Sequence, residues 1–117
     1  MDIGAGTGHL SVGLANLGAR VTATEGPGKS LASLVSWSSQ LLRETTGGGL
    51  PVEGSNTRLG SGTSFGGSVD RRELWWGGDF NGLDAEGDFD VVLMSEVVYD
   101  VDCHEALLHT LKQSLKP

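Results

Sequence analysis

Three glycines at alternate positions, Gly4, Gly6 and Gly8, constrain the fold of this chain more than any other feature. Glycine lets a backbone turn sharply and lets a ligand approach main-chain atoms without meeting a Cβ. Residues 1–3 precede the glycines, and a stretch with helical apolar spacing follows them. The arrangement predicts a turn from a strand into a helix, of the kind that binds a nucleotide. A tight turn without a ligand is the alternative.

Hydrophobic periodicity predicts alternating helices and strands after this loop. The expected helices cover residues 10–17, 30–42 and 107–115, and the expected strands cover residues 20–24, 72–76 and 89–94. Residues 89–94 form a continuous apolar run after Gly87-Asp88, which is typical of a strand buried on both faces of a parallel sheet. Asp100 or Asp102 is expected to open the last helix. The order predicts an α/β domain with a mostly parallel sheet and flanking helices.

Residues 45–70 differ from their surroundings because Gly, Ser and Thr dominate them without an apolar period. Such a segment buries too little apolar surface to offset its ordering entropy, so we expect a flexible insertion inside one domain, 1–117. Three residues before the loop are few for a central strand, and the chain ends in a helix where an α/β pattern would add a strand. We therefore expect a partial domain that is incomplete at both ends; an unusual start at a true Met1 is the alternative.

Charge and cysteine content exclude several classes of protein. The chain has 8 basic and 15 acidic side chains, a formal charge of −7, which argues against a nucleic-acid-binding domain. Its one cysteine, Cys103, excludes an internal disulfide and a cysteine-based zinc cluster, and no metal site is expected from its histidines. No apolar run approaches the roughly 20 residues of a membrane span. We expect a chain that works in the cytoplasm, with the nucleus as the alternative, and not at a membrane.

The glycine spacing narrows the choice of nucleotide. A dinucleotide fingerprint needs a small residue at position 9 or 11, depending on register, and neither His9 nor Ser11 completes the pattern. A P-loop fails because no Gly-Lys-Ser/Thr follows. The remaining G-x-G-x-G form is associated with S-adenosylmethionine, which has no phosphates and fits a loop without Lys or Arg. Glu25 ends the next predicted strand, where a carboxylate accepts hydrogen bonds from ribose hydroxyls; a surface carboxylate is the alternative.

Several segments together resemble one enzyme family. Residues 2–8, 21–25, 74–77 and 89–100 resemble successive motifs of the seven-strand lysine methyltransferases, the family-16 or methyltransferase-like group of class I enzymes, which have a Rossmann-like fold. Residues 107–117 are similar to the helix that follows. The most specific part is residues 96–99, which are similar to the family's acidic-x-x-aromatic signature. The chain departs from the family in three places. Asp2 stands where members often carry Glu, and Glu25 and Glu96 stand where members often carry Asp.

The resemblance implies a role for each matching position. Gly4, Ala5 and Gly6 would contact the methionine end of S-adenosylmethionine, Glu25 its ribose, and Trp76 and Ser95 the surroundings of its adenine. The full set of implied cofactor-binding residues is Asp2, Gly4, Ala5, Gly6, Gly8, Glu25, Trp76 and Ser95.

Glu96 and Tyr99 are the candidate catalytic residues. A lysine amine must lose its proton before it attacks a sulfonium methyl, and a carboxylate or an aromatic hydroxyl orients it and guides the proton away. Both residues follow a predicted strand of a parallel sheet, where ligand crevices open. The alternatives are a structural acid at Glu96 and a core aromatic at Tyr99.

The implied function is S-adenosylmethionine-dependent protein-lysine N-methylation. The implied partner is a protein substrate with an accessible lysine. Two other functions stay open: a catalytically inactive Rossmann-like fragment that binds or regulates, and a methyltransferase for small molecules.

Overall fold

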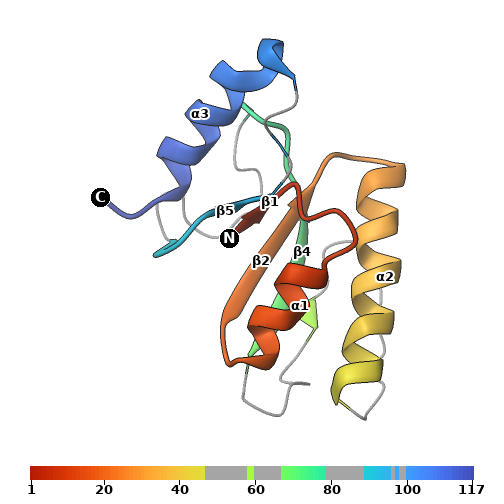
Figure 1. Ribbon diagram of the computed structural model, residues 1–117. Coiled ribbons are helices and arrows are strands. Elements are labelled where there is room, and N and C mark those ends of the chain that lie inside the picture. Colours follow the sequence, from red (N-terminus) through yellow and green to blue (C-terminus); the bar gives the residue numbers. More distant parts are fainter. Residues whose placement is uncertain (47–57, 60–66, 79–88, 96, 98–99) are drawn as a thin grey trace.

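A five-stranded sheet organises the part of the chain described by the computed structural model, residues 1–46, 58–59, 67–78, 89–95, 97 and 100–117. Figure 1 shows its elements in the order β1 (Asp2–Ile3), α1 (His9–Asn16), β2 (Arg20–Glu25), α2 (Lys29–Thr46), β3 (Arg58–Leu59), β4 (Ser68–Glu73), β5 (Leu93–Met94), the 3₁₀ turn η1 (Val101–Cys103) and α3 (His104–Ser114). This alternation confirms the predicted α/β class.

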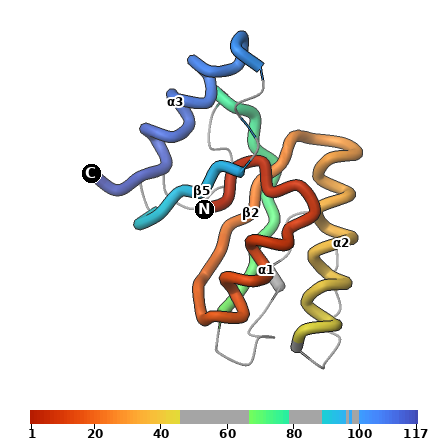
Figure 2. The backbone as a smooth tube through the Cα atoms, viewed as in Figure 1, coloured from red at the N-terminus to blue at the C-terminus, as the bar shows by residue number. Residues whose placement is uncertain are grey.

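The sheet has the strand order β3-β4-β2-β1-β5, and every pair is parallel except β3 with β4. β1 is only two residues long, yet it lies in the middle, with Asp2 paired to Ala23 of β2 and to Leu93 of β5. Figure 2 shows the N-terminal residues in the centre of the fold, between these two strands. The predicted mostly parallel sheet with flanking helices is therefore confirmed.

Helices cover both faces of the sheet (Figure 1). α1 and α2 pack on one face, where they form an apolar core with β2 and β4 that consists of Val12, Ala15, Val21, Ala23, Leu31, Leu34, Leu42 and Val69. α3 packs on the other face, over a second core of Met1, Ile3, Leu74, Val97 and Leu107. Successive side chains of a strand point to opposite faces, so Ile3 joins the second core while Asp2 points toward α1.

The predicted helices are confirmed, and their ends have local causes. Gly18 lies two residues after the end of α1. It has a φ of 98°, and its N–H donates to the Ala15 carbonyl at 2.9 Å, as expected for a glycine that follows a helix. Asp100 stands before η1 and α3, and its carboxylate accepts from the Asp102 N–H at 3.0 Å. The predicted opening of the last helix near Asp100 is therefore confirmed.

The buried guanidinium of Arg71 in β4 forms hydrogen bonds to α2. Arg71 is fully buried, and its guanidinium donates to Ser39 Oγ at 3.0 Å and to the Val35 carbonyl at 3.3 Å. Burial lowers the pKa of Arg71 to about 10. α2 is amphipathic, and none of the helices in the described ranges is long and apolar enough to cross a bilayer.

The prediction of a strand at 72–76 is wrong, because β4 covers Ser68–Glu73 instead. Its polar sequence gives no apolar run to recognise, yet all six residues pair in register with β2. Neighbouring-strand hydrogen bonds and the bonds made by Arg71 stabilise a strand that side-chain hydropathy alone does not indicate.

The prediction of a strand over 89–94, buried on both faces, is also wrong in extent and burial. Only Leu93 and Met94 form β5, while Phe89 makes an isolated parallel bridge to Leu115. Val91 is 61% exposed and Met94 is 40% exposed. The reason is position: among the described strands β5 lies at the edge of the sheet and pairs only with β1.

The structure differs from the predicted 45–70 insertion at both of its ends. α2 continues to Thr46, and the Thr45 hydroxyl donates to the Leu41 carbonyl at 2.8 Å. β4 begins at Ser68, and β3 pairs with it across Val69 and Asp70. Helical hydrogen bonds at the end of α2, and strand pairing at β3 and β4, satisfy the backbone groups of these residues in spite of their composition. Residues 47–57 and 60–66 of the predicted insertion lie outside the described residues.

Candidate functional site

The glycine loop, residues 4–8, connects β1 to α1 at the carboxyl edge of the sheet. Gly4, Gly6 and Gly8 have φ angles of 66°, 60° and 87°, which L side chains rarely adopt. At Gly4 space is also limiting, because an added Cβ would lie 2.5 Å from Val97 Cγ1. The predicted strand-to-helix turn is confirmed, and a crevice at this edge of a parallel sheet is the usual location of a ligand.

Backbone hydrogen bonds hold the loop against the sheet. The Ala5 N–H donates to the Thr24 carbonyl at 3.0 Å, which ties the loop to β2. The Gly8 N–H donates to the Ala5 carbonyl at 3.0 Å, and the Gly8 carbonyl accepts the first helical bond of α1 from Val12 at 2.9 Å. The loop is therefore shaped by its own main chain before any ligand binds.

Glu25 and the loop line one cavity of about 340 Å³. Its lining residues are Gly6, Thr7, Glu25, Lys29, Ser30 and Ser33, contributed by the loop, the end of β2 and the first turns of α2. Burial raises the pKa of Glu25, and hydrogen bonds from the backbone of Gly26 and Gly6 oppose that rise. The structure thus brings two of the predicted cofactor residues, Gly6 and Glu25, to one cavity.

Asp2 lies beneath the loop and not in the cavity. Its side chain is 1% exposed, and its Oδ2 accepts a hydrogen bond of 2.6 Å from the Ser11 hydroxyl of α1. Its other oxygen, Oδ1, is buried without a hydrogen-bond partner among the described residues. Burial raises the pKa of Asp2, and the bond from Ser11 and the N-terminal ammonium oppose that rise. Asp2 is therefore buried between β1 and α1 and is not among the residues that line the cavity.

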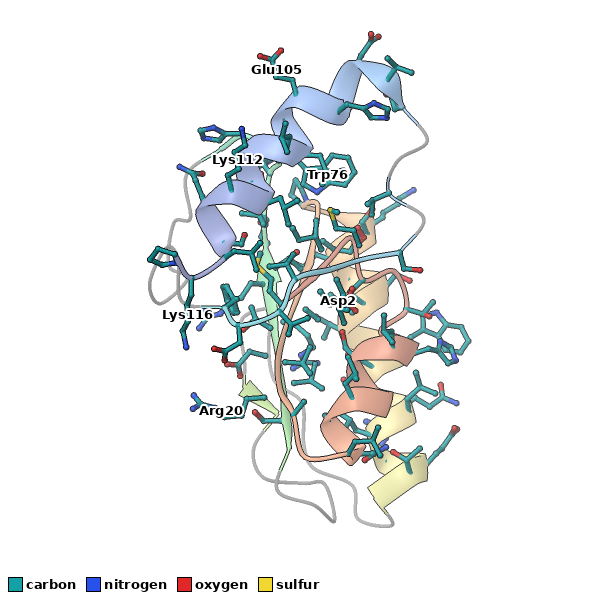
Figure 3. The ribbon with its side chains drawn as sticks, turned by 60° about the vertical axis from the view of Figure 1, so that its left-hand side comes forward. Asp2, Arg20, Trp76, Glu105, Lys112 and Lys116 are labelled. Atoms are coloured by element: carbon teal, nitrogen blue, oxygen red, sulfur yellow. The ribbon has the colours of Figure 1, made fainter. Side chains whose placement is uncertain are left out.

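Trp76 approaches the loop from the segment after β4. It is half-buried and packs against the second core, and its Cζ2 lies 3.8 Å from the position a Cβ on Gly4 would take. Figure 3 shows it beside α3. Its neighbour Gly77 donates its N–H to Thr110 Oγ1 of α3 at 2.8 Å, which fixes the turn. Trp75, by contrast, is 64% exposed.

The segment after β5 meets the loop at Val97. Val97 is 3% exposed and lies against Gly4, and Ser95 is exposed just before it. The candidate catalytic residues Glu96 and Tyr99 lie outside the described residues. Val97 is the one residue of the predicted 96–99 signature that the structure describes, and it lies at the glycine loop.

A larger cavity, about 810 Å³, lies away from this site, along the sheet at the amino ends of its strands. Arg20, Asp70, Arg72 and Val91 are among its lining residues. Figure 3 shows Arg20 at the opposite end of the sheet from Trp76. Because ligands of open parallel sheets bind at the carboxyl ends of the strands, we place the candidate site at the smaller cavity.

Within the described ranges, no group of three or more His, Cys, Asp or Glu side chains is arranged to hold a metal ion. Burial and the neighbouring Asp100 carboxylate raise the pKa of Cys103. His9 is exposed, and its Nδ1 lies 2.6 Å from the Thr7 hydroxyl.

The sequence patterns assign no site role to Ser11 or Thr110. Ser11 only fails to complete a dinucleotide fingerprint, and Thr110 only falls within a predicted helix. Both are fully buried and make hydrogen bonds to residues far away or across the loop. Buried hydroxyls on the inner face of an amphipathic helix are the signal that points to such partners.

Comparison with known proteins supplies the family. No curated protein and no solved structure matches the chain. A sequence model of the family described as lysine methyltransferase matches residues 54–117, more than half of the chain. The matched part contains Trp76, Ser95 and the 96–99 signature, while the glycine loop and Glu25 precede it. The chain therefore belongs to the lysine methyltransferase family, and its α/β fold is that of a methyltransferase.

Proposed function

We propose that this chain binds S-adenosylmethionine across the glycine loop and transfers its methyl group to a lysine side chain of a protein substrate. One observation carries the cofactor part of the proposal: Gly6 and Glu25 line one cavity at the carboxyl edge of the sheet. Family membership carries the lysine part. Location in the cytoplasm and the lack of nucleic-acid partners stay predictions.

The residues of this site fit S-adenosylmethionine by their chemistry. Glu25 offers acceptor oxygens, which the two ribose hydroxyls need. The loop offers backbone groups without a side chain in the way at Gly4 and Gly6, and the loop has no Lys or Arg that would call for a phosphate. The buried charge of Asp2 and the carboxylate of Glu25 suit a ligand with a positive sulfonium.

The proposed roles follow the position of each residue. Gly4, Ala5 and Gly6 accommodate the methionine end, Glu25 holds the ribose, and Trp76 provides an apolar wall near Gly4 for the adenine. Ser95 is exposed directly after β5 and is proposed to hydrogen-bond near the adenine. Gly8 acts through the loop, because a Cβ there would meet Ser38 Cβ at 2.9 Å.

S-adenosylmethionine supplies a methyl group that its sulfonium charge already activates. The protein's task is to hold a neutral lysine amine in line with that methyl in a water-poor site. Glu96 and Tyr99 are proposed to orient the amine by hydrogen bonds and to help guide its proton away, since a lysine with a pKa near 10.4 is protonated in water. The N–C bond forms as the S–C bond breaks, and the leaving group is the neutral thioether.

Calorimetry tests the cofactor site. We expect wild-type protein to bind S-adenosylmethionine, and Glu25→Ala to weaken binding by about 1–3 kcal/mol, the range for lost hydrogen bonds to a charged group. Glu44→Gln is the matched control, because Glu44 is an exposed acid on α2 that contacts Gln40 and lies outside the cavity. Equal affinity in wild type and Glu25→Ala would remove Glu25 from the site.

A transfer assay tests the reaction. Protein incubated with methyl-labelled S-adenosylmethionine is expected to label lysine in a protein extract and not a pool of small molecules. Glu96→Gln and Tyr99→Phe are expected to lower the rate while keeping cofactor affinity. Binding without any transfer would favour the regulatory fragment, and label in small molecules would favour the other enzyme class.

A further inference from the structure

Ser11 joins the two ends of the glycine loop. It is the third residue of α1, it is fully buried, and its hydroxyl donates to Asp2 Oδ2 at 2.6 Å. Asp2 is in β1, so this side-chain bond links the strand that enters the loop to the helix that leaves it. Backbone bonds to Thr24 and within the loop do not connect these two elements directly.

The loop needs such a link because its glycines have wide conformational freedom. Gly4, Gly6 and Gly8 all have positive φ, and glycine loses more backbone entropy on ordering than any other residue. A bond between residues 2 and 11 fixes the separation and direction of the loop's two ends. It therefore limits the conformations in which the loop can meet a ligand.

Ser11 also acts on the charge of Asp2. The carboxylate is 1% exposed, and Oδ1 has no hydrogen-bond partner within the described part of the chain. Burial raises the pKa of Asp2, and the Ser11 bond opposes that rise, so Ser11 favours the ionised form. The Asp2 charge extends to the cavity, since it raises the pKa of Glu25.

We propose that Ser11 is a positioning residue of the cofactor site, which fixes the buried Asp2 carboxylate beneath the loop and thereby favours a cationic cofactor over its neutral product. This proposal rests on the proposed function. S-adenosylmethionine carries a sulfonium charge, whereas S-adenosylhomocysteine is neutral at sulfur. A fixed negative charge in a buried site therefore attracts the first more than the second.

The charged groups around Asp2 are few. The ammonium of Met1, just before β1, and Glu25 of β2 interact with it electrostatically, and Lys29 of α2 lines the cavity beside Glu25. From β5, Leu93 and Met94 carry no charge, and the exposed His9 of α1 contacts Thr7. Asp2 and Glu25 are thus the carboxylates whose ionisation sets the pH dependence of binding, together with the Met1 ammonium, whose pKa burial lowers from 8.0.

Calorimetry with both ligands from pH 5 to 8 tests the proposal. We expect Ser11→Ala to weaken S-adenosylmethionine binding about ten-fold or more, a typical loss for a hydrogen bond to a charged group. Binding of S-adenosylhomocysteine should weaken less, and the acid limb of the S-adenosylmethionine profile should move to higher pH. In an Asp2→Asn background, Ser11→Ala should change neither the ligand preference nor the pH midpoint.

Ser114→Ala is the matched control. Ser114 is also fully buried in a helix, and its hydroxyl donates at 2.7 Å to the Thr110 carbonyl, away from the loop. It should lower stability without changing ligand preference. If Ser11→Ala weakens both ligands equally with no shift in pH midpoint, Ser11 is only structural and the proposal is overturned.

A measurement on the wild type covers the case in which Ser11→Ala does not fold. The side-chain carboxyl of Asp2, followed by carbon NMR, should titrate above the usual aspartate range and shift to lower pH when S-adenosylmethionine is added. An Asp2 titration that S-adenosylmethionine leaves unchanged would overturn the proposal. A wild type that binds neither ligand would instead overturn the proposed function itself.

Discussion

Val97 packs against Gly4 so closely that a Cβ on Gly4 would lie 2.5 Å from Val97 Cγ1. Gly4 is the first residue of the glycine loop and follows β1. Val97 follows β5, the strand that pairs with β1 on the side opposite β2. The contact places Val97, which belongs to the 96–99 signature, against the loop proposed for cofactor binding. A residue without a side chain at position 4 is what allows the two to meet.

Substitutions at Gly4 and Gly6 measure this contact. Gly4→Ala should lower the free energy of unfolding by about 2–5 kcal/mol, because left-handed backbone strain adds to overpacking against Val97. Gly6→Ala is the control, since Gly6 has a similar φ of 60° but nothing within 4 Å of an added Cβ. It should cost only the strain, about 1–2 kcal/mol. Urea unfolding of both variants checks the difference, and equal losses would contradict the steric role of Val97.

Gly67 and Gly13 should respond to alanine in opposite directions. An added Cβ at Gly67 would lie 1.8 Å from the Ala15 carbonyl oxygen, so Gly67→Ala should destabilise the fold by at least about 3 kcal/mol. Gly13 lies inside α1 with nothing within 4 Å, so Gly13→Ala should stabilise it by about 0.5–1 kcal/mol. Thermal unfolding compares the two variants. A mild effect at Gly67 would show that the β4 start can move away from α1.

Thr110 should control the turn that carries Trp76. Thr110→Val keeps the side-chain shape but removes the hydroxyl that accepts the Gly77 N–H at 2.8 Å, and should cost about 1 kcal/mol of stability. S-adenosylmethionine affinity should fall as well, because Trp76 would be less fixed beside Gly4. Thr110→Ser retains the hydroxyl and should retain most of the affinity. Calorimetry measures the S-adenosylmethionine affinity of both variants. Equal affinity in Thr110→Val and wild type would mean that this turn does not contribute to the cofactor site.

The burial of Asp2 should make stability depend on pH. Its pKa is raised in the folded protein above the ordinary 3.8, so its contribution to stability is fully present below that value. The contribution is lost as pH rises from about 4 through the raised folded pKa, because a buried carboxylate must then ionise. Asp2→Asn removes this titration, while Glu25 titrates in both proteins.

The stability of Asp2→Asn relative to wild type should therefore increase with pH. Urea unfolding of both proteins at intervals between pH 4 and pH 7 gives the difference. A constant difference over this range would mean that Asp2 titrates alike in the folded and unfolded states.

Local sequence patterns determined much of this protein. Apolar spacing of three and four residues identified the helices, since burying one face of a helix imposes that period on neighbouring residues. Alternate glycines identified the strand-to-helix turn, because positive φ angles at Gly4, Gly6 and Gly8 are a local backbone requirement. The spacing of Glu25 along the chain from that turn predicted its place at the end of the next strand. In each case the constraint acts within a few residues of the one that satisfies it.

Only the tertiary structure decided features that depend on distant partners. β4 is polar in sequence and is ordered by pairing with β2 and by the bonds of Arg71 to α2. Gly67 belongs to a segment whose composition predicts flexibility, yet glycine is required there, just before β4, because the Ala15 carbonyl approaches it. The Ser11 hydroxyl bonds to Asp2 because the loop turns the chain so that α1 packs beside β1. Hydrogen bonds and steric contacts between elements leave no periodic trace in the chain, so they appear when the elements are packed together.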